Sequence, residues 1–384
     1  MLGLKLHLFS VIALTSLSVV LAKETSFWSH IAAIEARDIS SSLQQQKHYS
    51  DMSKRAVVHA HHPVPVHGPA PAPHSSSVKC THPVPRVSFY SLTPAEQSAW
   101  IHSFQQLHNP GKSIFIKGGS FMDDLAMVHI GLQEEMHYNS CFLVCHSAFL
   151  RAFYSLMRVS GYKGREAYWD IESDYQHGLE NAGLWNTFGT DDGKGGPIPN
   201  GPFKNIKCGI LPNTKQPGRS IVKPHFVTRH FNGDWNRKPM IRGDMYSSHF
   251  NATLYDNFLK APNYTKLRLQ LEATVHAWIH QSIGGEMWMF SAVCEPAFWL
   301  LHAEIDRYWR SWQNRHNGWF DYEGHRRIRR KDGTTEYKLA TLDDTIDFYG
   351  LFEKVKVRDL MHPRRGILCY SYDRLFGGVP DNAK

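Results

Sequence analysis

Residues 271–313 read LEATVHAWIHQSIGGEMWMFSAVCEPAFWLLHAEIDRYWRSWQ, and the rest of the chain is interpreted from the histidine pattern in them. His276 and His280 stand four residues apart in a helical pattern, so both imidazoles project from one face of a helix. His302 is the only polar residue of the apolar run 298–303, which predicts a second, buried helix. A turn at Gly284 and Gly285 would fold one helix against the other and bring three imidazoles together. Such a set of neutral nitrogen ligands suits copper or zinc, although a histidine pair with this spacing is about as often a solvated helix face.

A second histidine set makes the metal hypothesis stronger. It consists of His129, His137 and His146, and the first and last of these also lie in apolar, helix-compatible surroundings. An imidazole buried there costs free energy unless it is hydrogen-bonded or bound to a metal. Neither set has a carboxylate or thiolate at ligand spacing, which favours copper over cations that prefer oxygen ligands. A dinuclear zinc hydrolase would be expected to have a bridging Asp or Glu. We therefore predict two copper ions held by imidazole alone.

Charge and composition are those of a globular protein. The chain has 384 residues and a net charge of +8, and its basic residues are scattered except for a cluster at residues 325–331. That cluster could contact an acidic surface or nucleic acid, but we interpret it as a solvated turn or helix end. We expect no nucleic-acid partner.

The first residues predict export from the cell. Residues 1–22 have the pattern of a signal peptide, with Lys5, an apolar run and a small-residue cleavage site at Ala22. The run is too short for a membrane span, so we expect a secreted protein without a membrane partner after signal cleavage. Six cysteines in the mature part fit up to three disulfides, and Asn251 and Asn263 begin N-glycosylation sequons.

Composition also divides the rest of the chain. Residues 23–55 end in a dibasic pair and predict a propeptide, the alternative being a helical extension that stays attached. Residues 56–85 are rich in Pro and His and predict an extended linker. A folded domain at 86–373 and a tail at 374–384 follow. Thr93 and Glu96 form a capping-box pattern for a helix that continues to Leu107. We predict a mainly α fold, with a four-helix bundle around a dinuclear copper site, long loops and a few short strands.

Several motifs together resemble the tyrosinase and catechol oxidase family of type 3 copper proteins, in its short fungal form. They are the spacing of His137 and His146, the stretch GYKGREAYWDIESD at 161–174, the Gly201-Pro202-Phe203 turn, the Pro296-to-Trp309 pattern around His302, and Tyr370-x-Tyr372. The resemblance covers roughly residues 86–372. It implies that His129, His137 and His146 bind the first copper, and that His276, His280 and His302 bind the second. It also implies a disulfide between Cys80 and Cys369.

The chain departs from the family pattern around these ligands. Cys145 and Ser147 stand where the family has Trp and Arg beside the third ligand, and Glu295 stands for the usual Asp. Further departures are Tyr154, Ala167, Leu301 and Glu304. In the family, the Arg and the Asp commonly bridge the two halves of the site. We hypothesise that a disulfide between Cys145 and Cys294 replaces that ion pair.

The resemblance implies oxidation of small phenols, with dioxygen as co-substrate. Hydroxylation of monophenols is associated in the family with a Glu and with an Asn directly after the fourth ligand, where this chain has Ala277. We therefore expect oxidation of o-diphenols or o-aminophenols to o-quinones with weak or no monophenol hydroxylation. Glu272 could act as a base, Met289 as a gate over the second copper, and Phe298 could stack on a ligand ring. The alternatives are an oxygen- or copper-binding relative without turnover, or a structural relative of the fold.

Overall fold

A computed structural model describes residues 80–233, 243–330, 333–365 and 367–381. The predicted signal peptide, propeptide and most of the linker lie outside the described residues. The described chain is mainly helical with a few short strands, which confirms the predicted fold class. The helices and strands that position the site are named below with their bounds.

The N-terminal part of the described chain supplies four helices, and the last three of them carry or flank the first histidine set. Thr93 caps α2 (Pro94–Leu107) through the predicted capping box with Glu96. A second capping box, between Ser120 and Asp123, starts α3 (Phe121–Gly131). The short α4 (Gln133–Met136) then leads into the long α5 (Cys141–Val159), whose residues are almost all buried.

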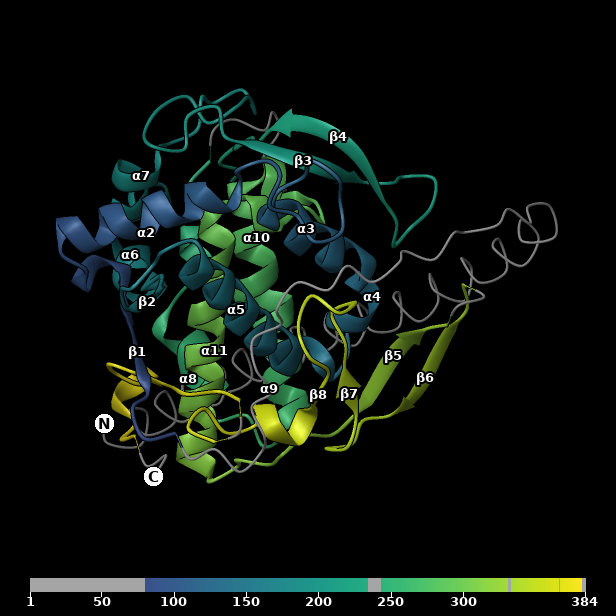
Figure 1. The fold of residues 1–384 in the computed structure, drawn as a ribbon. Coiled ribbons are helices and arrows are strands. Elements are labelled where there is room, and N and C mark those ends of the chain that lie inside the picture. Colours follow the sequence, from purple (N-terminus) through teal and green to yellow (C-terminus); the bar gives the residue numbers. More distant parts are fainter. Residues whose placement is uncertain (1–79, 234–242, 331–332, 366, 382–384) are drawn as a thin grey trace, which may run out of the picture. The chain divides into compact units, whose positions relative to one another are not determined.

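The C-terminal half supplies the other central helices. Asn263 caps α9 (Tyr264–Leu271), which continues through the π-helical turn η6 (Glu272–His276) into α10 (Ala277–Ile283). Pro296 begins α11 (Pro296–His316), and Glu295 is its N-cap. α11 packs against α5, and α10 lies next to them in the middle of the described fold (Figure 1). Helices from both halves of the described chain thus come together in the region of the predicted ligands.

Small sheets and short helices complete the fold. The middle strand β1 (Val84–Ser88) pairs in parallel with β2 (Glu166–Tyr168) and with β9 (Tyr370–Tyr372). Between residues 181 and 262, where the sequence predicts long loops and short strands, the structure has the hairpin of β3 (Lys207–Pro212) and β4 (Ser220–Phe226). It also has the helices α7 (Gly183–Phe188) and α8 (Ala252–Leu259), which the sequence pattern did not indicate.

One sequence interpretation is wrong. The basic cluster at 325–331 is no solvated turn or helix end, because β5 (His325–Arg329) pairs with β6 (Thr335–Leu339) in an antiparallel hairpin. Arg326 is 3% exposed and lies 3.8 Å from the carboxylate of Asp344. Arg327 points to Glu134, 3.6 Å away. Strand alternation hides part of the charge, which a count of basic residues does not reveal.

Both ends of the predicted domain are held to its body. Cys80 forms a disulfide with Cys369, which confirms the pairing that the resemblance implied. β1 begins at Val84, two residues before the predicted start of the domain at 86. At the other end, Phe376 packs edge-on against Tyr308 of α11, and its amide donates to Ser311 Oγ.

Candidate metal centre

The first histidine set gathers from three consecutive segments. His129 lies in the last turn of α3, His137 directly follows α4, and His146 lies in the second turn of α5. The ring of His137 lies 5.0 Å from that of His129 and 4.9 Å from that of His146, measured between centroids. One nitrogen of each ring comes within 4.8 Å of the others, which is the geometry of a three-nitrogen metal site.

The second set depends on the irregular helix that α9, η6 and α10 form. His276 ends the π turn and His280 lies one turn later, with ring centroids 4.4 Å apart. His302, in the second turn of α11, brings its ring to 5.2 Å from His276. π turns inside α-helices occur frequently at functional sites. Here too, one nitrogen of each ring comes within 4.8 Å of the others.

The two sets touch each other. The rings of His146 and His302 stack in parallel, with centroids 4.2 Å apart and planes inclined by only 6°. His137 and His276 also face each other at 5.8 Å. Two metal ions bound by these sets would therefore be close neighbours.

Backbone carbonyls fix the orientation of five of the six rings. Each of these rings places Nδ1 at hydrogen-bond distance from a carbonyl oxygen, which makes Nδ1 the protonated nitrogen and leaves the lone pair on Nε2. The distances are 2.7 Å from His129 to Phe290 O, 2.9 Å from His137 to Gln133 O, 2.8 Å from His146 to Phe142 O, 3.3 Å from His276 to Glu272 O and 2.6 Å from His280 to Met287 O.

The Nε2 atoms are then available for metal. Those of His129, His146, His276, His280 and His302 are buried and have no hydrogen-bond partner among the described residues. Burial lowers the pKa of His129 and of His280 to about 4, and it lowers the pKa of the other four well below the ordinary value, with repulsion between neighbouring imidazoles as a further cause. Neutral imidazoles with unpaired Nε2 fit copper, and no carboxylate joins either set.

Comparisons with known proteins agree with this chemistry. Residues 95–315 match the model of the common central domain of tyrosinase. The chain belongs to the tyrosinase family. Membership makes it a copper oxidoreductase, and the family's dinuclear copper site corresponds to the two histidine sets.

Similar proteins are known from fungi. The tyrosinase-like protein phomQ1' of Diaporthe leptostromiformis is 28% identical over 314 residues, which cover 77% of this chain and 81% of that protein. Tyrosinase ustQ of Aspergillus flavus is 28% identical over 308 residues, 76% of this chain and 80% of its own. Among solved structures, a mutant polyphenol oxidase from Thermothelomyces thermophila shares the fold, with a TM-score of 0.61 and 22% identity over 75% of this chain and 88% of that one.

Phe298 lies among the ligands of this tyrosinase-family site. Its ring centroid is 4.3 Å from that of His302 and 5.2 Å from that of His129, so it touches both sets. The side chain is 1% exposed. Phe298 is therefore placed as a wall between ligand rings rather than as a surface for substrate.

Glu272 is already engaged. One oxygen of this buried carboxylate accepts from the amide of Tyr138 at 2.5 Å, and the other lies 3.1 Å from Arg268 Nη1. Both carboxylate oxygens of Glu272 thus already have partners in the protein. What the geometry does show is a link from the second histidine set to the residue after His137; the role of Glu272 as a base stays a prediction.

Phe290 lies beside the site, although the sequence did not indicate it. Met289, the predicted gate, is half-buried, whereas the ring of its neighbour Phe290 is 37% exposed and lies 5.8 Å from the ring of His137. Trp288 and Tyr138 are also exposed large side chains close in sequence to groups of the site. Proximity to Met289 is the only signal in the sequence that could have indicated Phe290.

The hypothesised disulfide between Cys145 and Cys294 is wrong. Cys145 pairs with Cys141 one turn earlier in α5, and Cys294 pairs with Cys208 of β3. The partner of Glu295 is an arginine after all: Arg229 donates to both carboxylate oxygens at 2.9 and 2.7 Å, and both side chains are fully buried. Glu295 therefore still forms an ion pair, but its partner is an arginine from a distant part of the chain. The sequence around Glu295 gives no indication of this partner.

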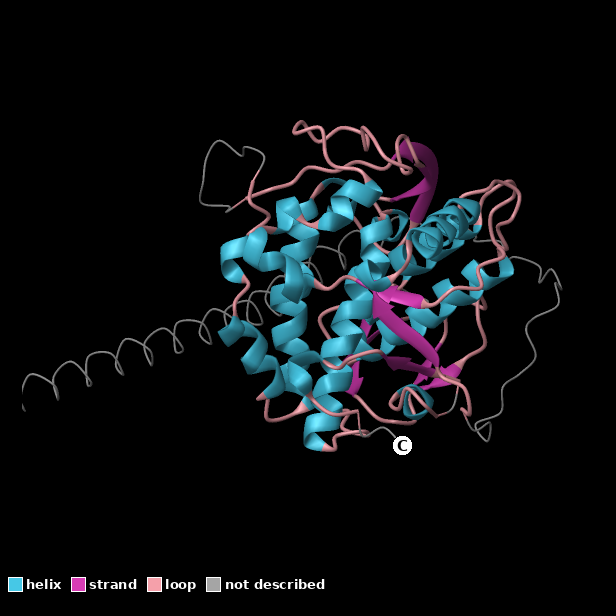
Figure 2. Ribbon diagram, turned by 90° about the vertical axis from the view of Figure 1, so that its left-hand side faces the viewer, coloured by secondary structure: helices cyan, strands magenta, loops and turns pink. Residues whose placement is uncertain are grey.

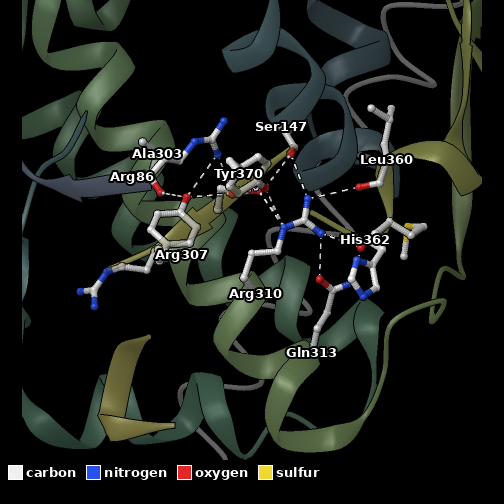
Figure 3. Close-up of polar contacts among 12 residues, drawn as sticks. Arg86, Ser147, Ala303, Arg307, Arg310, Gln313, Leu360, His362 and Tyr370 are labelled. Atoms are coloured by element: carbon white, nitrogen blue, oxygen red, sulfur yellow. Dashed lines mark hydrogen bonds and ion pairs between the residues drawn. The ribbon is translucent and has the colours of Figure 1, made fainter. Parts of the chain in front are cut away.

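A second distant arginine supports the serine after His146. Arg310 of α11 donates to Ser147 Oγ at 2.9 Å and to Tyr370 Oη at 2.9 Å (Figure 3). It also donates to the carbonyl oxygens of Leu360 and Met361. Where the family pattern has an arginine at position 147, this chain brings a guanidinium from α11 toward the same place.

Proposed function

We propose that this protein oxidises o-diphenols, or o-aminophenols, to o-quinones with dioxygen, and that it hydroxylates monophenols weakly or not at all. The observation that carries the proposal is the set of buried Nε2 atoms without partners, in two adjoining groups of three imidazoles. Bound copper would supply the electron transfer between the phenol and dioxygen. Each diphenol gives up two electrons and two protons, so two diphenols reduce one dioxygen to two molecules of water.

The residues of the chain contribute orientation and exclusion of water. Backbone carbonyls hold five ligand rings in one tautomer, so no ring has to reorganise when metal binds. The ring of Phe298 lies between the two histidine sets and excludes water from the space that it fills. Phe290 presents a partly exposed ring beside His137, where the ring of a phenol could pack.

The preference for diphenols rests on Ala277. This half-buried residue directly follows His276 and has no group that could hold a water molecule near the site. The carboxylate of Glu272, which could otherwise take the phenol proton, is paired with Arg268. Removal of that proton would thus be slow, whereas an o-diphenol does not need the hydroxylation step.

The first experiment measures copper content together with oxidation of catechol and of tyrosine by the protein cleaved after Arg55. Two coppers per chain with catechol oxidation and little tyrosine hydroxylation are expected. Robust tyrosine hydroxylation would contradict the preference for diphenols. Two coppers without oxidation of either substrate would favour an oxygen- or copper-binding relative instead. The variant Ala277→Asn provides a gain-of-function test, since it should raise the hydroxylation of tyrosine relative to the oxidation of catechol.

We also propose that the protein is secreted. The leader pattern of residues 1–22 supports this, and so do three disulfides in the described part of the chain. The sequon residues Asn251 and Asn263 are exposed, and each caps a helix through its side-chain oxygen. Among the described residues, no helix is long and apolar enough to cross a membrane. Recovery of the protein from culture medium, with a mass that falls after glycosidase treatment, would be the expected result.

A further inference from the structure

Residues 284–291 contact both histidine sets through their backbone, and we call them the carbonyl segment. Met287 O lies 2.6 Å from Nδ1 of His280, and Phe290 O lies 2.7 Å from Nδ1 of His129. His137, His146 and His276 use a carbonyl four residues earlier instead. One ligand of each set therefore depends on a segment outside its own helical turn. The position of that segment sets the direction of both Nε2 lone pairs.

A buried carboxylate holds the carbonyl segment in place. Glu286 is fully buried, and its Oε1 accepts from Ser291 Oγ at 2.5 Å, so it closes the segment on itself. Its Oε2 lies 3.0 Å from Nε2 of His225 on β4, which ties the segment to the hairpin. Its amide donates to Thr228 O at 2.9 Å. Both carboxylate oxygens are thus used inside the protein.

His225 completes this anchor. Its Nδ1 lies 3.1 Å from Lys223 O while Nε2 faces Glu286, so both ring nitrogens face acceptors. A neutral imidazole has one N–H and serves only one of them, whereas the imidazolium serves both. Partial burial opposes protonation, but the hydrogen bond and the charge of Glu286 outweigh burial and the charge of Lys223, and they raise the pKa of His225.

The anchor is not a third metal site. Cys208 Sγ, His225 and Glu286 come close enough to hold an ion, but Cys208 is bonded to Cys294 and offers no thiolate. The imidazole and the carboxylate act on each other. Glu286 itself belongs to the carbonyl segment, which connects the anchor with the two histidine sets.

We propose that Glu286 is a positioning residue for both copper sites at once. By holding Ser291 and His225 it fixes the carbonyl segment, and through Met287 O and Phe290 O it orients His280 and His129. The inference rests on the proposed copper chemistry, because orientation of Nε2 matters only toward a metal. Since one anchor serves one ligand of each set, loosening it weakens the binding of both coppers together.

The test compares Glu286→Gln with the control Asp344→Asn. Asp344 is also a buried carboxylate, 5% exposed, and it pairs with Lys338 and Arg326 rather than with any residue that contacts a ligand histidine. Hydrogen exchange of the metal-free proteins reports on the segment itself. Competition with a chelator gives the affinity for each copper, and steady-state kinetics with catechol separate kcat from KM.

In Glu286→Gln we expect faster exchange in the carbonyl segment and about tenfold weaker binding of both coppers, the usual cost of losing a group that orients a ligand. With copper in excess, kcat should fall more than KM changes. Ser291→Ala removes one of the two side-chain contacts of Glu286 and should show the same changes more weakly. This second variant can be tested if Glu286→Gln does not fold. Asp344→Asn should match the native protein in exchange of the segment and in copper affinity.

Unchanged exchange in the segment, or a loss of copper affinity confined to one site, would overturn the proposal. So would equal losses in Glu286→Gln and Asp344→Asn, since these would reflect general destabilisation. A native protein that binds two coppers but does not oxidise catechol would contradict the proposed function only. The role of Glu286 would still be decided by hydrogen exchange in the carbonyl segment and by copper affinity. A native protein without copper affinity would overturn both.

Discussion

The helix α11 carries two buried polar residues, His302 and Asp306, that differ in whether the chain itself supplies their main partners. In its first half, His302 is 1% exposed, and neither of its ring nitrogens has a hydrogen-bond partner among the described residues. In its second half, Asp306 accepts from the hydroxyls of Tyr370 and Tyr372 at 2.5 and 2.8 Å and from Arg86 at 2.9 Å. Arg310 is equally well bonded (Figure 3).

The difference separates a metal site from a structural network. An unpaired buried polar group costs about 1–3 kcal/mol, so a fold keeps one where something absent from the chain completes it. A buried charge instead needs its partners from the chain itself, because desolvation without pairing is far more costly. Substitutions in the two halves should therefore affect different properties.

The largest effect is expected from His302→Ala. It removes one of three ligands of the second copper, so copper content should fall from two toward one per chain and catechol oxidation should become undetectable. The free energy of unfolding of the metal-free protein should change by no more than about 2 kcal/mol, because lost packing and relief of unpaired nitrogens oppose each other. Metal analysis and denaturant unfolding measure both. Two retained coppers would show that His302 is not a ligand.

Asp306→Ala should act on stability instead. It leaves the buried guanidinium of Arg86 short of a partner and the hydroxyl of Tyr370 without its close acceptor, so unfolding of the metal-free protein should become easier by about 3–5 kcal/mol. Asp256→Asn is the control, because Asp256 pairs with Lys260 on the surface and its loss should not change the midpoint of denaturation measurably. If Asp306→Ala were as stable as the native protein, the hydrogen-bond network around Asp306 would not stabilise the fold, and the contrast with the metal site would fail.

The same carboxylate should produce an acid-dependent loss of stability. Burial tends to raise the pKa of Asp306, but Arg310, Arg86 and the two tyrosine hydroxyls outweigh burial and lower it below its ordinary value. A lowered pKa contributes stability that is present above the unfolded pKa of about 4 and is lost as the pH falls through the folded value. Unfolding measured across this range should be less acid-sensitive in Asp306→Asn than in the native, metal-free protein. Parallel curves would contradict this assignment.

The smallest effect is expected at the exposed edge of the metal site. Phe290→Ala removes a partly exposed ring beside His137 but keeps the carbonyl that binds His129. KM for catechol should rise about two- to tenfold, the value of one aromatic contact, with copper content unchanged. Phe226→Ala, a ring of similar exposure on β4, should leave KM as it is. A lower kcat with unchanged KM would indicate that Phe290 acts on the ligands rather than on the substrate.

Features that depend on local spacing could be predicted. The capping box at Thr93 needs only residues three apart, and the helix does begin at Pro94. The pair His276 and His280 needs only helical periodicity, and the structure brings both to His302. The pairing of Cys80 with Cys369 came from the family resemblance, and the structure confirms it.

Features that depend on distant segments could not. Arg229 pairs with Glu295, and Arg310 donates to Ser147. The residues next to Glu295 and Ser147 in the sequence do not indicate either arginine. The π turn that ends at His276 is a local irregularity, but the apolar pattern of the sequence there is that of an ordinary helix. The disulfide prediction failed because cysteines beside altered positions could pair in several ways, and only the fold decides which come together.

Residue types and their spacing were enough to predict which groups can bind metal and on which kind of element each one lies. Imidazoles in apolar helices follow from residue type and periodicity, and both can be seen in the chain. Which nitrogen of each ring is free depends on contacts made in the folded protein, through the carbonyls of Met287, Phe290 and the helical turns. The tertiary structure also decided which distant charges stand behind the ligands. The physical reason is that hydrogen bonds and ion pairs need close approach of their atoms, and folding brings such atoms together regardless of their separation along the chain.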